Sequence, residues 1–223
     1  MSRTFTKISV HDCDNYQLRE TSTFIIDNPL TVLVGCNGSG KTTLMAEMQK
    51  ALDNEGIPWS KHYALESKNR ISYAVGRVSP NDTDVMQAFA ATTWASEGER
   101  IKNGFAYLVQ ELGDFVYNKC KNHSEAWIFL DSLDSGMSID NIREVIAFLE
   151  NTVLAEKPAH LDLHIVIAAN AFELAKQHDC LDVQMGTHHT FDDYDDYADF
   201  IMETSHRKEK YINTGPIDIS TLV

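Results

Sequence analysis

Eight consecutive residues have the types and spacing of a loop that binds phosphate groups. They read Gly35-Cys36-Asn37-Gly38-Ser39-Gly40-Lys41-Thr42 and match the pattern G-x-x-x-x-G-K-[ST] in full. Glycines at these positions let successive backbone N–H groups turn toward a phosphate, and a helix that begins there adds a partial positive charge. Lys41 is expected to bridge the β- and γ-phosphates, and the Thr42 hydroxyl is expected to coordinate Mg²⁺. The run therefore predicts a site for a magnesium–nucleotide complex.

The segments on either side of this run are those that a phosphate-binding loop needs. Residues 30–34 are almost entirely apolar, which is typical of a buried parallel strand. After the loop, Leu44, Met45, Met48 and Leu52 recur at helical spacing. Strand, glycine-rich loop and helix therefore follow one another in the order that the motif requires.

A carboxylate at the end of a second apolar strand can complete the site. Residues 126–130 are Ala-Trp-Ile-Phe-Leu, and Asp131 follows them directly. A carboxylate at the C-terminal end of a neighbouring buried strand can reach the Mg²⁺ ion of a phosphate loop. Asp131 is therefore the predicted partner of Thr42 in metal binding.

The remaining elements predict an α/β fold. Strands are favoured by β-branched and aromatic residues over 4–10, 23–27 and 164–168. Helices are predicted by apolar stripes over 97–119 and 139–154. Strands that alternate with helices imply a parallel sheet covered on both faces. Between about 53 and 92 the sequence is less informative, with weak strand signals at 71–78 and a turn at 79–82.

The composition excludes several classes of protein. The chain of 223 residues has 33 Asp and Glu against 19 Lys and Arg, a net charge of −14, which disfavours general coating of nucleic acid. No stretch approaches the roughly 18 apolar residues of a transmembrane helix. The four cysteines, at 13, 36, 120 and 180, are scattered as expected for reduced thiols. We therefore expect a cytoplasmic protein without a membrane partner.

The loop and two further segments resemble one family of ATPases. Residues 35–44 are similar to the G-x-N-G-S-G-K-[ST]-[ST]-L form of ABC-type ATPases, in particular the SMC-like and RecF-like branch that works on nucleic acids. Ser96-Glu97-Gly98-Glu99, which precedes a predicted helix, resembles the S-x-G-[EQ] signature of that family. Ser135-Gly136-Met137-Ser138 resembles its D-loop. The resemblance spans roughly residues 3–172.

The resemblance implies a P-loop NTPase three-layer sandwich, with a mostly parallel central sheet and an N-terminal antiparallel β element. It also implies a head-to-tail homodimer around two ATP molecules, in which Ser96 and the backbone of Gly98 contact the γ-phosphate held by the opposite chain. Without the family resemblance, the same residues have a simpler interpretation: Ser96 and Glu99 form a capping box at the start of a helix. The residues implied to bind nucleotide within one chain are Gly35, Cys36, Asn37, Gly38, Ser39, Gly40, Lys41, Thr42 and Thr43.

One ATPase head domain is expected over residues 1–223, with a short insert at 53–95 that leaves no room for coiled-coil arms. Basic residues gather in this insert, at Lys61, Lys68, Arg70 and Arg77. They make it the best candidate for contacting a nucleic acid or an unlike, acidic protein partner. Two other groups are less informative: acidic residues over 192–199 are expected to be a solvated surface, and His178, Cys180, His188 and His189 match no zinc pattern.

Two positions depart from the family pattern and bear on hydrolysis. The family usually has Glu directly after the Mg-binding Asp, where this chain has Ser132, and His after the next strand, where this chain has Asn170. A hydroxyl cannot accept a proton near pH 7 as a carboxylate can, so weak or slow hydrolysis is expected. Asp134 is a nearby carboxylate that could substitute, and Asn170 could donate a hydrogen bond to the γ-phosphate. The predicted catalytic set is Lys41, Asp131, Ser132 and Asn170.

Three functions remain open at this point. The first is an ATP-dependent dimer that hydrolyses ATP slowly and serves DNA metabolism or conflict with phages or mobile elements. The second is a small-molecule or nucleotide kinase, which also uses a phosphate loop and a strand-end Asp. Its lid needs arginines, and only Arg143 and Arg207 follow Asp131. The third is a non-hydrolysing interaction module gated by nucleotide, which Ser132 and Asn170 favour.

Overall fold

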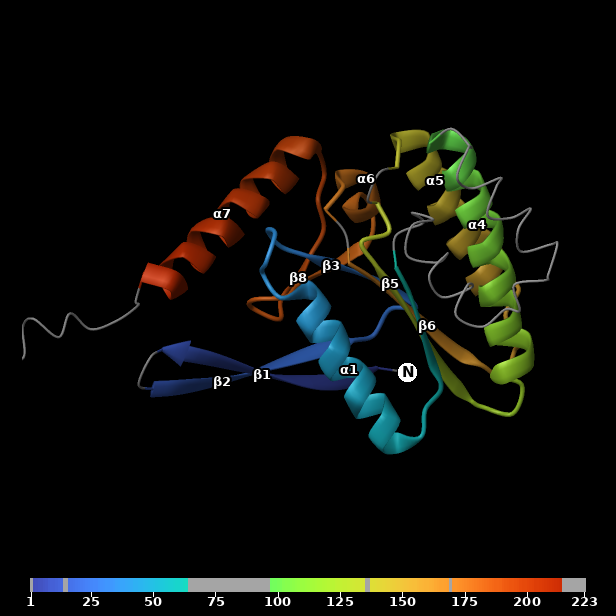
Figure 1. The fold of residues 1–223 in the computed structure, drawn as a ribbon, viewed down its shortest axis with the longest axis horizontal. Helices are drawn as coiled ribbons and strands as arrows, with labels where there is room; N and C mark the ends of the chain where they lie inside the picture. Colours follow the sequence, from blue (N-terminus) through green and yellow to red (C-terminus); the bar gives the residue numbers. More distant parts are fainter. Residues whose placement is uncertain (1, 14–15, 64–96, 135–136, 169, 214–223) are drawn as a thin grey trace, which may run out of the picture.

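A six-stranded sheet forms the centre of the protein (Figure 1). The computed structural model describes residues 2–13, 16–63, 97–134, 137–168 and 170–213. The strand order is β4-β5-β6-β3-β7-β8, and all neighbours are parallel except β7 and β8. The bounds are β3 Leu30–Val34, β4 Trp59–Tyr63, β5 Glu125–Asp131, β6 Asp162–Ala168, β7 Asp179–Asp182 and β8 His188–His189. The predicted α/β class with a mostly parallel sheet is confirmed.

Helices pack on both faces of this sheet. On one face, α1 (Lys41–Glu55) buries its apolar stripe against Leu33, Trp127 and Phe129. On the other face, apolar side chains of four segments share a second core with Ile128, Leu130 and Ile165. These segments are α4 (Glu97–Gly113), the π-helical η1 (Asp114–Lys119), α5 (Ile139–Phe148) and the π-helical η2 (Leu149–Leu154). An apolar core therefore lies on each face of the sheet. Figure 1 shows the helices on the two faces.

A separate antiparallel ribbon, β1 (Arg3–Cys13) and β2 (Tyr16–Ile26), confirms the expected N-terminal β element. Its base belongs to the core on the α1 face, where Phe5, Phe24 and Ile26 are buried. The ring of Phe5 meets Trp127 edge-on at 5.1 Å between ring centroids. This contact anchors the ribbon to the central sheet.

The predicted helices 97–119 and 139–154 are confirmed at both ends, although each finishes in a π-helical segment. All five predicted strands are present. Several elements were not predicted, namely β4, β7, β8, α6 (Phe172–Ala175) and α7 (Tyr194–Asn213). The expected strand at 71–78 and turn at 79–82 lie outside the described residues. Because α1 ends at Glu55 and β4 joins the central sheet, residues 53–63 of the expected insert belong to the main fold.

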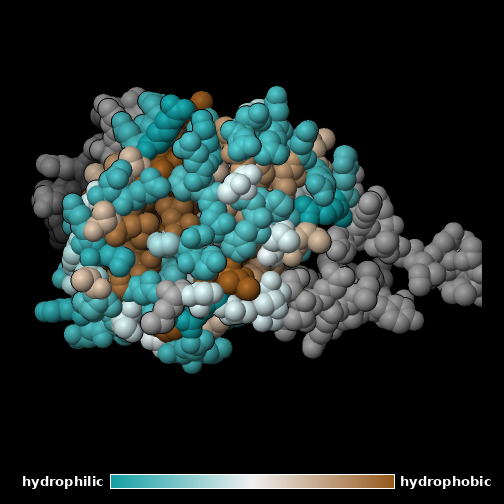
Figure 2. All heavy atoms as spheres, turned by 180° about the vertical axis from the view of Figure 1, so that it is seen from behind, coloured by the Kyte–Doolittle hydropathy of each residue, from teal (hydrophilic) through white to brown (hydrophobic). Residues whose placement is uncertain are grey.

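Hydrophilic side chains cover most of the face seen in Figure 2, with smaller apolar areas between them. None of the helices in the described residues has the length and apolar character that crossing a membrane requires. The acidic residues of 192–199 are exposed, as expected for a solvated surface. Asp193 also caps the start of α7, because its carboxylate accepts a hydrogen bond from the backbone N–H of Asp196 at 2.9 Å.

His188 links the ribbon to the edge of the central sheet. Its Nδ1 lies 2.8 Å from both carboxylate oxygens of Asp179, and its Nε2 lies 2.9 Å from the carbonyl oxygen of Ile25. Both nitrogens therefore face acceptors, which requires a protonated ring. Burial disfavours the charge, but the hydrogen bond to Asp179 and the charges of Asp179 and Asp27 outweigh it, so the pKa of His188 is raised above 6.5.

This link should make stability depend on pH. A raised pKa in the folded state means that the stabilisation is fully present below pH 6.5 and is lost as the pH rises through the folded pKa. We expect His188→Gln to lower the free energy of unfolding by less than about 1 kcal/mol, because solvent screens a partly exposed pair. Urea denaturation across pH 5 to 9 should show the largest difference at the acidic end. Exposed His123 offers a control, since His123→Gln should show no such trend.

Candidate functional site

The glycine-rich loop joins β3 to α1 at the C-terminal edge of the sheet. Gly35, Gly38 and Gly40 have φ values of +142°, +74° and +103°, a region that side chains with a Cβ rarely adopt. A Cβ on Gly35 would lie 2.7 Å from the Ser39 hydroxyl oxygen. Glycine is therefore needed for this backbone path, and the loop has the tight turn that the sequence motif predicts.

The ammonium of Lys41 folds back into this loop. Nζ donates hydrogen bonds to the carbonyl oxygens of Gly35 at 2.7 Å and Cys36 at 3.3 Å. Burial lowers the pKa of Lys41, against the charges of Cys36, Asp134 and Asp131. A partly buried cation whose hydrogen-bond partners are neutral carbonyls is well prepared to receive an anion, because a phosphate oxygen makes a stronger, charge-assisted hydrogen bond.

The start of α1 leaves hydrogen-bond donors free for such an anion. Gly40 is the N-cap residue and has no side chain to cap the helix, and the first turn contains no acidic residue. The hydroxyl of Ser39 is buried and has no hydrogen-bond partner among the described residues. Helix N-termini without a cap attract anions through unpaired N–H groups and the helix dipole. Thr43, the last residue implied to bind nucleotide, is exposed on the first turn.

Asp131 and Thr42 meet as predicted. The Thr42 hydroxyl lies 3.2 Å from Oδ1 of Asp131, although β6 separates the strands that precede the two residues. The carboxylate is buried. A hydroxyl and a carboxylate are oxygen ligands of the kind that Mg²⁺ takes in proteins, so this pair fits the metal that the sequence implies.

Lys61 is not available to an acidic partner, contrary to the sequence interpretation of the basic cluster. Its Nζ lies 3.1 Å from Oδ2 of Asp131, and its side chain is 12% exposed. The pair forms because β4 lies beside β5 in the sheet. The other basic residues of that cluster, Lys68, Arg70 and Arg77, lie outside the described residues.

Two residues that follow Asp131 have unusual features: the backbone of Ser132 is an outlier, and the carboxylate of Asp134 is fixed by hydrogen bonds. Ser132 is exposed and has a φ of +56°, a strained value for a non-glycine residue and one that clusters at functional sites. Asp134 accepts hydrogen bonds at Oδ2 from the backbone N–H groups of Asn170 at 2.8 Å and Ala171 at 2.6 Å. Its Oδ1 is buried and has no hydrogen-bond partner among the described residues. One oxygen of Asp134 is thus fixed by two backbone N–H groups.

Asn170 follows β6, which lies between the strands that carry the loop and Asp131. Its backbone is committed, since its N–H donates to Asp134 and its carbonyl accepts from the Tyr197 hydroxyl at 2.9 Å. Its side chain is exposed. Asn170 is therefore placed at the predicted edge of the site, with the side chain free of that backbone network.

Helix α7 supports the phosphate loop, which the sequence interpretation missed. The Thr204 hydroxyl accepts a hydrogen bond from the backbone N–H of Cys36 at 2.9 Å and donates one to the carbonyl of Ile201 at 2.7 Å. Lys208 donates to the carbonyl of Asn37 at 2.8 Å. A helical pattern over Tyr197, Phe200, Ile201 and Thr204 could have revealed the helix, but not its contact with the loop.

Removing the Thr204 hydroxyl should weaken the fold. Thr204 is fully buried, and in Thr204→Val the N–H of Cys36 loses its acceptor while the side-chain shape is kept. A buried donor left unpaired costs about 1–3 kcal/mol, and we expect a loss of that size in the free energy of unfolding by urea denaturation. Thr204→Ser, which keeps the hydroxyl, should lose less. Equal losses for the two variants would show that methyl packing matters more than the hydrogen bond.

The expected signature and D-loop are described only in part. Ser96 lies outside the described residues, and Gly98 is the second residue of α4. Ser135 and Gly136 also lie outside them, while Met137 is partly buried and Ser138 is the N-cap residue of α5. The contacts expected across a dimer interface stay predictions.

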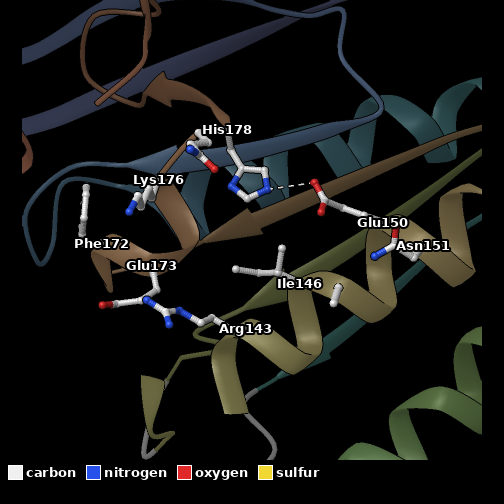
Figure 3. Close-up of a pocket in the computed structure, with 10 residues that line it drawn as sticks. Arg143, Ile146, Glu150, Asn151, Phe172, Glu173, Lys176 and His178 are labelled. Atoms are coloured by element: carbon white, nitrogen blue, oxygen red, sulfur yellow. Dashed lines mark hydrogen bonds and ion pairs between the residues drawn. The ribbon is translucent and has the colours of Figure 1, made fainter. Parts of the chain in front are cut away.

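A hollow of about 460 Å³ lies between α5, η2 and α6, away from the glycine-rich loop (Figure 3). Its lining mixes opposite charges, with Arg143 and Lys176 beside Glu150 and Glu173. His178 lies 3.2 Å from the Glu150 carboxylate, an interaction drawn as a dashed line in Figure 3. With no dominant charge, the hollow indicates no particular ligand.

The buried thiols lie in apolar surroundings. Burial raises the pKa of Cys180 to about 12 and that of Cys120 to about 11. The Cys180 thiol donates a hydrogen bond to the carbonyl of Ala175 at 3.3 Å. Asp27, Asp179 and His188 have potential ligand atoms within 4.8 Å of one another, but both nitrogens of His188 are already used in hydrogen bonds. These groups are explained by packing and by the link between ribbon and sheet.

Comparison with known proteins gave no family assignment, because no family model and no curated protein matches this chain.

Proposed function

We propose that the protein is a magnesium- and ATP-binding ATPase of the ABC type, from the SMC-like and RecF-like branch. The observation that carries the proposal is the meeting of the glycine-rich loop with Asp131 through the Thr42 hydroxyl, at 3.2 Å. The Lys41 ammonium, the uncapped start of α1 and the unpaired Ser39 hydroxyl lie around the same loop. Together they supply the donors for a triphosphate and the oxygen ligands for its magnesium ion.

The sheet order favours this proposal over a kinase. Because β6 lies between β3 and β5, Asn170 follows a strand that ends between the phosphate loop and Asp131. This is the place where a γ-phosphate contact is expected. Of the two arginines after Asp131, Arg207 is paired with the buried Asp182 at 2.7 Å, and Arg143 lines the hollow between α5, η2 and α6. Among the described residues, these contacts give no support to a kinase lid built on either arginine.

The chain's own groups suggest slow hydrolysis. Lys41 binds and orients the phosphates, and bound Mg²⁺ would neutralise part of their charge. Ser132 cannot act as a base near pH 7, whereas Oδ1 of Asp134, which has no partner in the described part of the chain, can accept a hydrogen bond from water and then its proton. We therefore assign Asp134 the role of orienting and deprotonating the attacking water. A biological role in DNA metabolism, or in conflict with phages or mobile elements, is inferred from the family resemblance alone.

Solution mass tests the proposal directly. Light scattering should give the mass of a monomer without nucleotide and the mass of a dimer with Mg-ATP. In Lys41→Ala the mass should not change with Mg-ATP. A monomer in every condition despite proven ATP binding would contradict the dimer and favour a kinase or an unlike protein partner.

The rate of ATP turnover then distinguishes a slow ATPase from the non-hydrolysing alternative. If Mg-ATP drives dimerisation but single-turnover experiments detect no hydrolysis, the protein is a non-hydrolysing module gated by nucleotide. Turnover at tens per second would contradict slow hydrolysis and the role assigned to Asp134 in place of the missing glutamate.

A further inference from the structure

Asp131 has a partner on each of its carboxylate oxygens. Oδ1 lies 3.2 Å from the Thr42 hydroxyl, and Oδ2 lies 3.1 Å from the ammonium of Lys61. The side chains of Lys61 and Asp131 are only 12% and 5% exposed. The carboxylate assigned to the metal therefore already has a cationic neighbour that belongs to the protein.

The sheet register produces this pair. Lys61 of β4 lies opposite Phe129 of the parallel strand β5, and Asp131 follows two residues later on the same face. The long lysine stem can reach forward to that carboxylate. The ring centroid of Tyr63 lies 4.8 Å from Nζ and gives the ammonium a second favourable contact. The position of Lys61 is thus set by the fold.

Two charges compete for the same carboxylate. A buried carboxylate that loses a paired cation is strongly destabilised, so Lys61 supports the protein when no metal is bound. A metal ion that approaches Asp131 on its own is repelled by the ammonium, and this repulsion is strong where water is excluded. A triphosphate changes the balance, because it adds several negative charges that two cations can share.

We propose that Lys61 controls access to the magnesium site: its ammonium takes the place of the metal on Asp131, so the site rejects free Mg²⁺ and accepts it only together with a triphosphate. The inference rests on the proposed function, because it takes Asp131 as the metal ligand. It makes Lys61 a specificity-determining residue. The site then responds to the nucleotide and is insensitive to the magnesium concentration alone.

Lys61→Gln tests this role with MgCl₂ as the only ligand. The glutamine amide can still donate a hydrogen bond to Asp131, but it carries no charge. At constant ionic strength, the Tm of the wild-type protein should not change with MgCl₂. The Tm of Lys61→Gln should be lower without metal and should rise by several degrees, in a saturable manner, as MgCl₂ is added. Titration calorimetry with MgCl₂ should detect binding to the variant only.

Three further variants isolate the charge. Lys61→Arg keeps the cation and should stay insensitive to MgCl₂. Lys50→Gln removes the same charge from an exposed pair with Glu47 on α1, and it should behave as wild type. Adding Asp131→Asn to Lys61→Gln should abolish the response to MgCl₂, which locates the bound metal at Asp131.

Two results would overturn the inference: stabilisation of the wild type by MgCl₂ alone to the extent seen in Lys61→Gln, or no response in a Lys61→Gln protein that still binds Mg-ATP. In the second case the proposed function stands. A wild type that binds no Mg-ATP would contradict the proposed function instead. If Lys61→Gln folds only with MgCl₂, the inference is supported. If it never folds, binding of free Mg²⁺ by Lys61→Arg contradicts the inference and its absence supports it.

Discussion

Replacing Lys41 by alanine is expected to reduce the affinity for Mg-ATP by at least about a hundredfold, because each charge-assisted hydrogen bond to phosphate is worth about 1.5–3 kcal/mol and Lys41 would make two. The ammonium already lies inside the loop, 2.7 Å from the carbonyl of Gly35. Burial lowers its pKa, and contact with a phosphate would favour the charged form of the ammonium. Titration calorimetry with Mg-ATP measures the change.

The matched control is Lys50→Ala, which removes the same charge from the exposed side of α1. Its affinity for Mg-ATP should stay within about threefold of wild type, because an exposed charge outside the site contributes little. Thermal melting without nucleotide should show that Lys41→Ala remains folded. Equal affinities for Lys41→Ala and wild type would show that the loop does not bind phosphate.

Asp134→Asn is expected to reduce single-turnover hydrolysis by about a hundredfold or more, the usual contribution of a positioned general base. The amide oxygen of asparagine can accept the hydrogen bonds from Asn170 and Ala171 that Oδ2 accepts now, so the backbone should keep its path. The amide nitrogen would then face the position of Oδ1 and could not take a proton from water. Affinity for Mg-ATP should change by less than about threefold, since binding and proton transfer depend on different groups.

Ser132→Ala serves as the comparison at the position where the family has glutamate. Its rate should change by less than about threefold, because the hydroxyl is a poor base near pH 7. A large loss in Ser132→Ala together with normal turnover in Asp134→Asn would reverse the two roles. A loss of ATP affinity in Asp134→Asn would indicate that the carboxylate supports the loop and has no part in proton transfer.

Local patterns were sufficient for the elements that carry the phosphate loop. The apolar run at 30–34, the glycines and the stripe beginning at Leu44 each specify their own backbone, so β3, the loop and α1 could be predicted. The pairing of Thr42 with Asp131 could also be expected, because both lie at the C-terminal edge of a parallel sheet. These elements are stabilised mostly by local interactions or by the burial of one continuous apolar face.

The missed parts depend on contacts between distant segments. Strand β4 reads Trp-Ser-Lys-His-Tyr, with polar residues that give no clear alternation, and it is held by pairing with β5. From the sequence, Lys61 was expected to be an exposed basic residue. In the structure its ammonium pairs with Asp131, and its side chain is largely buried. The first turn of α7 is acidic, which makes the apolar stripe of this helix hard to recognise in the sequence. No pattern near Thr204 indicates that its side chain contacts a loop 168 positions earlier. Tertiary pairing, which a single sequence does not display, decides these features.

The support of the phosphate loop by α7 has a consequence for the order of events during synthesis. The loop emerges from the ribosome early, but the groups that bind its Cys36 N–H and Asn37 carbonyl follow 168 and 171 residues later. Domains begin to fold as the chain grows from its N-terminus, and contacts over such separations form last. The proposed nucleotide site therefore matures only after α7 has docked. Nascent chains halted before Lys208 would carry an intact motif in an unfinished loop, so the proposed ATP binding would report that translation has passed this point.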